Sequence, residues 1–436
     1  MTRKINRRER NAIIQSLSAG VVPRVGLQHI QVGRSNEVSA LINDLKQVEE
    51  GAASIRFVVG RFGSGKTFFL NLIRTVALER RFVVVQADIT TDRRLHGTGG
   101  KARSLYSELM RNLSTRAKPD GGALSNLVER WVGDVVNDVK QAGGSDEDIK
   151  REIDRRIKPI QELVSGYDFA RVLERYYQGY SEHNEELQEC ALRWLRAEYT
   201  TRTEANRDLG VRSIIEDANV YDYLKLMAGF VRIAGFNGLL INIDELVVLS
   251  HRLNSTQARN NNYEAILRIL NDCLQGQCEG LAFLFAGTDE CIEDRRRGLY
   301  SYEALSTRLA PNRFATEGLV DMSSPVIKLE SLTAEDCYVL LNNIRSVFSF
   351  HDPAQHLLTD DAIEAYLHDC HERLGAQHFQ TPREITRDFV RMLNILEQNA
   401  GADWRQLLGQ VQAQVKQEDN AMGDGMPDDD LAGFTL

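Results

Sequence analysis

The sequence predicts an α/β fold with a five-stranded parallel sheet, a long helical insertion and a helical lid near the C-terminus. Three observations predict this architecture. Apolar runs of strand length recur along the chain, at residues 53–59, 82–88, 239–245, 281–288 and 326–329. Because helix-compatible segments separate these nearly continuous apolar runs, we expect buried parallel strands joined by crossover helices. Residues 101–232 read as almost entirely helical, with breaks at Pro119–Gly122, Gly143–Ser145 and Gly166.

The composition is that of an ordinary globular protein, with 42% of the 436 residues hydrophobic and 26% charged. The formal net charge of −9 excludes a generally basic, nucleic-acid-binding surface, although a local basic patch is compatible with it. Six cysteines without paired Cys-x-x-Cys spacing predict reduced thiols and a cytoplasmic location rather than a zinc site. No run reaches the ~18 apolar residues of a membrane helix, and the basic start lacks the apolar core of a signal peptide.

A glycine-rich loop follows the first strand directly, with the sequence Gly60-Arg61-Phe62-Gly63-Ser64-Gly65-Lys66-Thr67-Phe68. A strand, Gly-x4-Gly-Lys-Thr and a helix in this order form the P-loop (Walker A) motif, which disfavours an ordinary glycine turn. The glycines allow backbone N–H groups to wrap around phosphate oxygens. Lys66 is expected to contact the β- and γ-phosphates, and Thr67 to bind Mg²⁺. The loop therefore predicts a site for ATP and Mg²⁺.

A second motif ends the strand at residues 238–245. This apolar strand delivers Asp244 and Glu245 at its C-terminal end, as in a Walker B motif. Asp244 is expected to hold Mg²⁺ through water, because this cation keeps part of its water shell. Glu245 is expected to act as the general base that polarises the attacking water. A strand that ends in a solvated acidic pair is the competing interpretation, and the P-loop in the same chain disfavours it.

An arginine occupies an unusual place in the helical segment at residues 335–397. Thr381 is a good N-cap and Pro382 suits the first helical position, so a helix is predicted to begin here. Arg383 then lies in the first turn, where the helix dipole disfavours a cation. Contact with a γ-phosphate would explain the placement, and a solvated arginine is the competing interpretation.

The order of these motifs resembles that of AAA+ ATPases. In that family the strand corresponding to residues 281–288 lies between the Walker A and Walker B strands. Its terminal polar residue (sensor 1) reaches toward the attacking water, which implies this role for Thr288, with Asp289 as second candidate. A lid arginine (sensor 2) faces the γ-phosphate, which implies that role for Arg383.

Two further stretches resemble AAA+ positions. A Gly-Arg-x-x-Glu stretch borders the adenine in that family, and Gly33, Arg34 and Glu37 match it, although a plain capping turn explains the same residues. Ring-forming members carry an arginine finger just beyond the sensor strand, which implies a homo-oligomer with Arg308 at the neighbouring γ-phosphate. Solvated arginines are the competing interpretation. The other candidates for the finger are Arg313 and the run Arg295–Arg297.

A narrower resemblance rests on the amino-acid sequences of four stretches, at residues 17–27, 32–37, 60–68 and 381–385. They are similar to the ATP-binding proteins of bacteriophage-exclusion (BREX) defence systems, particularly the compact BrxD type. The resemblance covers most of the chain and is weakest in the helical insertion and the tail. It implies a cytoplasmic bacterial protein that acts near DNA with other BREX components.

The core also resembles AAA+ proteins of the origin-recognition type, but the end of the chain departs from them. Those proteins append a winged-helix domain for DNA, whereas only about forty residues follow the helix of Arg383, too few for a domain. The basic residues 1–34, with seven Lys or Arg and one Glu, are the more plausible contact for DNA phosphates.

The sequence therefore predicts an AAA+-type ATPase of a BREX system. Two alternatives are a nucleotide-dependent switch or scaffold with negligible turnover, and a DNA-dependent loader outside phage defence. The expected division is a basic N-terminal segment and connector (1–34), two parts of the ATPase domain (35–96 and 237–330), a helical insertion between them (97–236), a helical lid (331–416) and an acidic, disordered tail (417–436).

Overall fold

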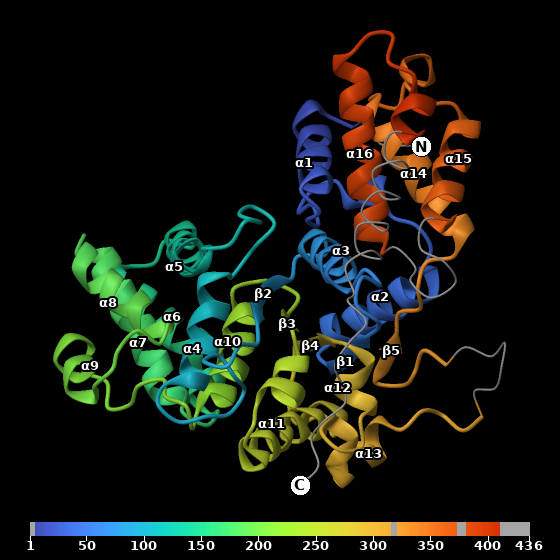
Figure 1. The fold of residues 1–436 in the computed structure, drawn as a ribbon. Helices are drawn as coiled ribbons and strands as arrows, with labels where there is room; N and C mark the ends of the chain where they lie inside the picture. The colour runs from blue at the N-terminus through green and yellow to red at the C-terminus, as the bar shows by residue number, and fades with distance from the viewer. Residues whose placement is uncertain (1–4, 315–320, 373–380, 410–436) are drawn as a thin grey trace, which may run out of the picture. The chain divides into compact units, whose positions relative to one another are not determined.

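The computed structural model describes residues 5–314, 321–372 and 381–409 (Figure 1). The chain forms two compact units. The first unit comprises Met1–Gly33, Phe62–Phe68 and Ser331–Leu436, and the second comprises Arg34–Arg61 and Phe69–Glu330. No helix within the described ranges combines the length and the apolar character that a membrane crossing requires.

The second unit is built on a five-stranded parallel sheet with the strand order β2-β3-β4-β1-β5. The sequence prediction of five parallel strands is confirmed, and so is the position of the 281–288 strand, β4, between β1 and β3. Each strand follows an apolar run of the sequence. Their bounds are β1 Ala53–Val59, β2 Val83–Asp88, β3 Leu239–Asp244, β4 Leu281–Gly287 and β5 Val326–Lys328.

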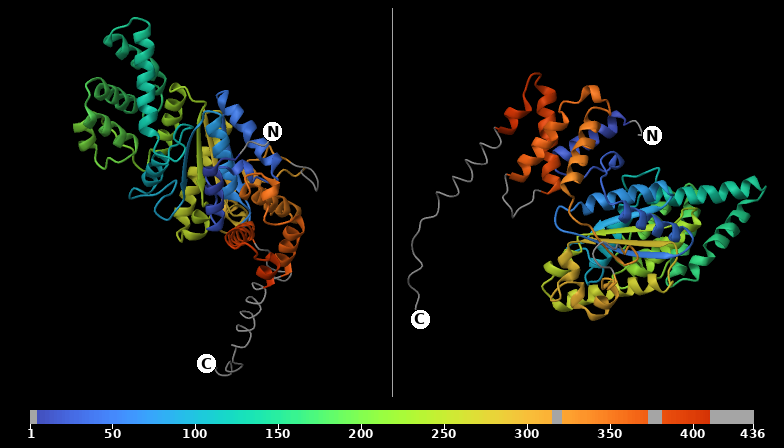
Figure 2. Two further views of the ribbon diagram at one scale, coloured as in Figure 1. Left: turned by 90° about the horizontal axis from the view of Figure 1, so that it is seen from above. Right: turned by 90° about the vertical axis from the view of Figure 1, so that its right-hand side faces the viewer.

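Alternate side chains of the sheet enter two separate hydrophobic cores, with helices on both faces (Figure 2). On one face Val58, Leu240 and Leu284 pack with α2 (Ser35–Glu49) and with the residues of α3 (Lys66–Glu79) from Phe69 onward. On the other face Phe57 and Phe283 belong to a larger core that includes α4, α10 and α11. The two buried faces explain why these strands are apolar along their whole length.

The insertion is helical, as the sequence predicts, and it joins the larger of these two cores. Edge-to-face aromatic contacts link its helices, including Trp131 on Phe230 and Trp194 on Tyr223. The insertion therefore shares one compact unit with the sheet. Its helices are α4 Lys101–Arg111, α5 Leu124–Gln141, α6 Asp146–Gln161, α7 Gly166–Ser181, α8 Glu185–Leu195, α9 Arg202–Leu209 and α10 Val220–Ile233.

The segment after β3 differs from the sequence prediction in one respect. The polar run at residues 253–262 predicts a loop, but α11 begins at Thr256, where the Ser255 side chain caps it. Asn262 is fully buried in this helix, and its amide bonds both backbone polar groups of His96, at 2.9 and 3.1 Å. The asparagines at 260–262 are typical of a loop, but the last of them makes a buried contact inside a helix. The elements here are η2 Val248–Arg252, α11 Thr256–Leu274, α12 Asp289–Glu293, η3 Leu299–Ser301 and α13 Glu303–Leu309.

The first unit is a helical bundle, and it includes the basic N-terminal helix. Ile13, Ile14 and Leu17 of α1 enter one core with α14 and α16. The N-cap expected at Thr381 is present as a complete capping box, and Thr333, which precedes the acidic residues Glu335 and Asp336, caps α14 in the same way. Residues 404–409 are helical, and the rest of the helix expected at 403–416 and the acidic tail lie outside the described residues. The elements are α1 Arg7–Ser18, η1 Leu27–His29, α14 Ala334–Phe348, η4 Pro353–Gln355, α15 Asp360–Glu372 and α16 Pro382–Gln398.

Candidate nucleotide-binding site

The carboxyl ends of β1, β4 and β3 meet at one edge of the sheet in the second unit. Val59 of β1 lies opposite Gly287 of β4, and the Gly60 N–H donates to the Gly287 carbonyl at 3.3 Å. On the other side β4 pairs in register with β3 up to Ile243, one residue before Asp244. Only β4 lies between β1 and β3, and neighbouring strands are about 4.8 Å apart. The ends of β1 and β3 are therefore two strand spacings apart. Ligands of open parallel sheets bind at this edge.

The P-loop continues from the end of β1 and requires glycine at two positions. Gly63 and Gly65 have φ angles of 82° and 88°, in the left-handed region that other residues rarely adopt. Lys66 and Thr67 are the first two residues of α3, and the first turn of this helix contains no acidic side chain. The positive end of the helix is therefore not neutralised by its own residues and suits an anion.

The backbone at the Asp-Glu pair is strained. Glu245 has a φ of 63°, a conformation that costs a non-glycine residue about 1–2 kcal/mol. Its N–H donates to Asp244 Oδ1 at 2.7 Å, and the N–H of the next residue, Leu246, donates to the carbonyl of Ala286 on β4 at 3.0 Å. The strained residue thus stands between two fixed points, with its side chain exposed at the carboxyl edge of the sheet. Strain of this kind gathers at functional sites.

Thr288 carries a buried hydroxyl for which the described residues offer no hydrogen-bond partner. It directly follows Gly287, which accepts the bond from the first P-loop glycine. Its Oγ1 is shielded from solvent and bonds no atom of the described residues. Asp289 begins α12 beside it. An unsatisfied buried hydroxyl costs stability unless a ligand or water completes it, which suits a residue that contacts a bound group.

Asn242, two positions before Asp244, was not predicted as part of the site. Its side chain is only 3% exposed, and within the described part of the chain neither its Nδ2 nor its Oδ1 finds a partner. Because strand residues alternate between faces, Asn242 and Asp244 belong to the same face of β3. The signal was a single polar residue inside an otherwise apolar strand.

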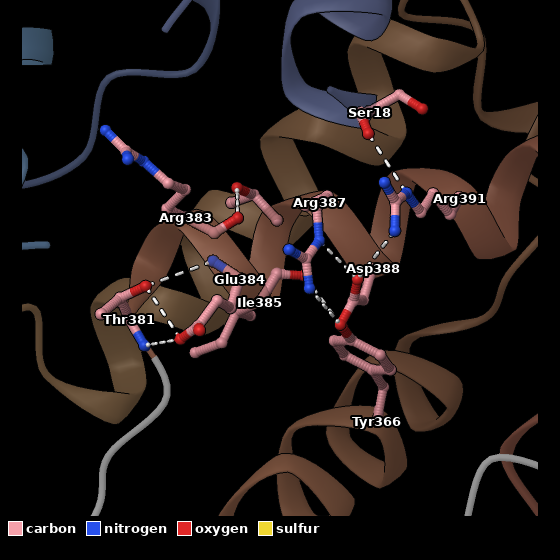
Figure 3. A network of polar contacts seen from close by, with 10 residues as sticks. Ser18, Tyr366, Thr381, Arg383, Glu384, Ile385, Arg387, Asp388 and Arg391 are labelled. Atoms are coloured by element: carbon pink, nitrogen blue, oxygen red, sulfur yellow. Dashed lines mark hydrogen bonds and ion pairs between the residues drawn. The ribbon is translucent and has the colours of Figure 1, made fainter. Parts of the chain in front are cut away.

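In the first unit Arg383 lies in the first turn of α16 (Figure 3). The guanidinium carbon of Arg383 is 5.8 Å from the ring centre of Phe62, which is 78% exposed. Phe68, at the other end of the same loop segment, packs against the hydrophobic core of the helical bundle. Thus the structure brings Arg383 together with the glycine-rich loop.

Three of the other candidate arginines, Arg34, Arg308 and Arg297, are hydrogen-bonded within their own chain. Arg34 lies at the N-cap of α2 and donates through Nη2 to the Glu330 carbonyl at 2.7 Å. Arg308 is exposed on α13, where it donates through Nε to Asn271 Oδ1 at 2.8 Å and through Nη1 to the Ala304 carbonyl at 2.9 Å. The remaining finger candidates are Arg313, Arg295 and Arg296, which are exposed, and Arg297, which donates to the Leu253 carbonyl.

The residues that the sequence predicts as magnesium ligands offer oxygen atoms. Thr67 offers a hydroxyl and Asp244 a carboxylate, which are ligands of hard cations such as Mg²⁺. The described residues contain no group of three or more His, Cys, Asp or Glu side chains arranged to hold a metal ion. This sparse set fits a magnesium ion that takes most of its ligands from phosphates and water.

The parallel sheet, the glycine loop after β1 and the helix that begins at its lysine are consistent with a P-loop NTPase. The sequence model of a known family identifies the group more closely. The chain belongs to the family described as BREX system ATP-binding protein BrxC/D, which matches residues 5–412. No curated protein matches the chain.

Proposed function

We propose that the chain is an AAA+-type ATPase that binds ATP with Mg²⁺ and hydrolyses it as a component of a BREX defence system. One observation carries the proposal. The P-loop leaves β1 and the Asp244–Glu245 pair leaves β3 at the same edge of the sheet, with only β4 between them. Both motifs would then serve one triphosphate. The family description supports ATP binding in a BREX system.

Each residue of the site receives a role from its chemistry. Lys66 and the N–H groups of the loop from Gly60 to Phe68 bind the phosphates. Glu245 orients the attacking water and takes its proton. Thr288 holds that water through the hydroxyl that has no partner among the described residues, and Arg383 senses the γ-phosphate from the lid. Arg34 borders the adenine.

The metal completes the site. Thr67 and, through water, Asp244 would hold Mg²⁺, which neutralises charge on the phosphate oxygens. This arrangement leaves the chain's own residues to position the triphosphate and the water. ATP binding would then bring the lid and the P-loop into one closed state that partner proteins read.

The wider setting follows from the family. We propose a cytoplasmic protein of the BrxD type that assembles with other BREX components. Exposed Arg7 and Arg8 on α1 are the candidates for contact with DNA phosphates.

In a homo-oligomer, Arg308 would act as the finger for the neighbouring subunit. Mixing Arg308→Ala with Lys66→Ala, which keeps the finger, should restore turnover. If mixing restores nothing, the finger does not act between subunits.

The proposal is tested by steady-state ATP hydrolysis with the full chain, with and without DNA. Wild type should turn over ATP, and Glu245→Gln should retain ATP binding while losing at least about 100-fold in rate, the usual contribution of a general base. Glu79→Gln, at the far end of α3, is the matched control and should hydrolyse at the wild-type rate. A Glu245→Gln enzyme as fast as wild type would refute the assignment of the base.

A second function, a nucleotide-dependent switch with negligible turnover, is favoured by one observation. The guanidinium of Arg308 is bonded within its own chain through Nε and Nη1. A finger held in this way would have to be released before it serves another subunit. This function predicts ATP-dependent partner binding in Glu245→Gln that equals that of wild type, and no hydrolysis by either protein.

A further inference from the structure

Thr381 of the lid packs directly on Gly63 of the P-loop, and both residues lie in the first unit. A Cβ atom placed on Gly63 would lie 2.5 Å from Cγ2 and 2.6 Å from Cβ of Thr381, closer than Cβ atoms approach other atoms. Its distance to Oγ1 would be 3.6 Å. Gly63 is therefore needed for two reasons: its positive φ, and the methyl group of the lid that fills the space beside it.

The capping box of α16 fixes the direction of that methyl group (Figure 3). Thr381 Oγ1 donates to Glu384 Oε2 at 3.0 Å and accepts the Glu384 N–H at 3.4 Å. The Thr381 N–H also donates to Glu384 Oε2, at 2.9 Å. Since the hydroxyl is committed to Glu384 on both counts, the rotamer is set, and the side of Thr381 that meets Gly63 is apolar.

The helix behind this contact is anchored over the next turns. The Tyr366 hydroxyl donates to the Ile385 carbonyl at 2.8 Å, and Arg391 donates to the Ser18 carbonyl of α1 at 3.2 Å (Figure 3). Ile385 itself is buried. The first turn of α16, which carries Arg383, is thus held by contacts with the bundle on one side and by the contact of Thr381 with Gly63 on the other.

We propose that Thr381 is a positioning residue that sets the reach of Arg383 toward the γ-phosphate. The methyl group rests on Gly63, the capping box transmits that position to the helix start, and Arg383 lies two residues further, with its guanidinium carbon 5.8 Å from the Phe62 ring centre. The proposal rests on the proposed role of Arg383. It adds that the position of the lid depends on the position of the loop backbone at Gly63. Arg383 is therefore aligned with the γ-phosphate only when the loop adopts its own binding conformation.

The same fold contains a matched control. Thr333 begins α14 with the same kind of capping box, in which its hydroxyl accepts the Asp336 N–H at 3.1 Å. Gly33 lies beside that box, but a Cβ on it would come no closer than 3.4 Å to its nearest neighbour, Asp336 Oδ1, an ordinary contact distance. Thr333→Ser and Thr381→Ser thus make the same chemical change, and only the second removes a methyl group from a P-loop contact.

The experiment measures the affinities of the full-length chain for ATP and for ADP by equilibrium titration, together with the melting temperature. Thr381→Ser keeps the capping bonds, so its melting temperature should be close to wild type. Because the role proposed for Arg383 is contact with the γ-phosphate, which ADP lacks, ADP affinity should be unchanged. The preference for ATP over ADP should fall about tenfold, less than the roughly 100-fold that a 1 Å misplacement can cost. Thr333→Ser should change neither affinity.

A further variant separates positioning from helix capping. Thr381→Val keeps a methyl group and the N–H bond to Glu384 but loses both hydroxyl bonds, so it should melt at a lower temperature and lose less of the ATP preference than Thr381→Ser. A purely structural role for Thr381 predicts the reverse order. Thr381→Ser with the wild-type ATP preference would overturn the proposal.

Arg383→Ala distinguishes the two levels of the argument. If Arg383→Ala loses the ATP preference but Thr381→Ser keeps it, Arg383 senses the phosphate and Thr381 does not position it. If Arg383→Ala keeps the preference, the sensor role fails and the positioning proposal fails with it. Lys66→Ala with unchanged affinity for both nucleotides would instead show that the P-loop assignment itself is wrong.

Discussion

At position 245 glycine should give a more stable fold than alanine, and both replacements should abolish turnover. Glu245 has a φ of 63°, which costs a side chain with a Cβ about 1–2 kcal/mol. Glycine avoids this cost but loses roughly 0.5–1 kcal/mol more backbone entropy on folding than alanine. Both variants lack the carboxylate, so the comparison isolates the backbone. Glu245→Gly should therefore be more stable than Glu245→Ala by about 0.5–1 kcal/mol.

A difference of this size in a unit as large as the second one corresponds to roughly 1–3 °C in melting temperature. Replicate calorimetric scans of both variants at one scan rate would resolve it. His183, in the turn before α8, has a φ of 56° and serves as the control position. The Gly–Ala difference should be similar there, with turnover unchanged. If Glu245→Gly is no more stable than Glu245→Ala, the strain at the site is not real.

Two further predictions concern buried polar residues. Arg56 donates two hydrogen bonds to Asp44, of 2.6 and 2.8 Å, and both side chains are nearly buried. Because Asp44→Ala leaves the charge of Arg56 without this partner, it should lower the free energy of unfolding, measured by urea titration, by about 3 kcal/mol. An unchanged midpoint would contradict this. Asn242→Leu should leave the stability unchanged or raise it by up to about 2 kcal/mol, because it removes an amide without partners among the described residues. Asn262→Leu, which loses bonds to the His96 backbone, should lower it, and equal losses in both variants would refute the distinction.

The strands and the loop of the site were predictable from the sequence because their signals are local. A nearly continuous apolar run that ends in Gly60 or in Asp244 specifies a buried parallel strand and the edge at which its motif emerges. The N-caps at Thr333 and Thr381 were predictable for the same reason, since a capping box involves residues three positions apart.

The rest of the site depends on contacts between residues far apart in the chain. Nothing near Gly63 in sequence indicates that Thr381 fills the space beside it. The positive φ of Glu245 was equally hidden, because glutamate gives no local signal for a left-handed backbone. The start of α11 was missed because Asn262 looks like a loop residue until its bonds to His96 are seen.

The most direct test of the account is an ATP titration of wild type, Lys66→Ala and Asp244→Asn, each with Mg²⁺ and with the metal chelated. If both strand ends serve one magnesium–ATP complex, each variant should bind ATP at least about tenfold more weakly than wild type when Mg²⁺ is present, the loss expected from one charge-assisted contact. On chelation the defect of Asp244→Asn should vanish, because its carboxylate acts through the metal, whereas that of Lys66→Ala should persist. Wild-type affinity of either variant in the presence of Mg²⁺ would contradict the account.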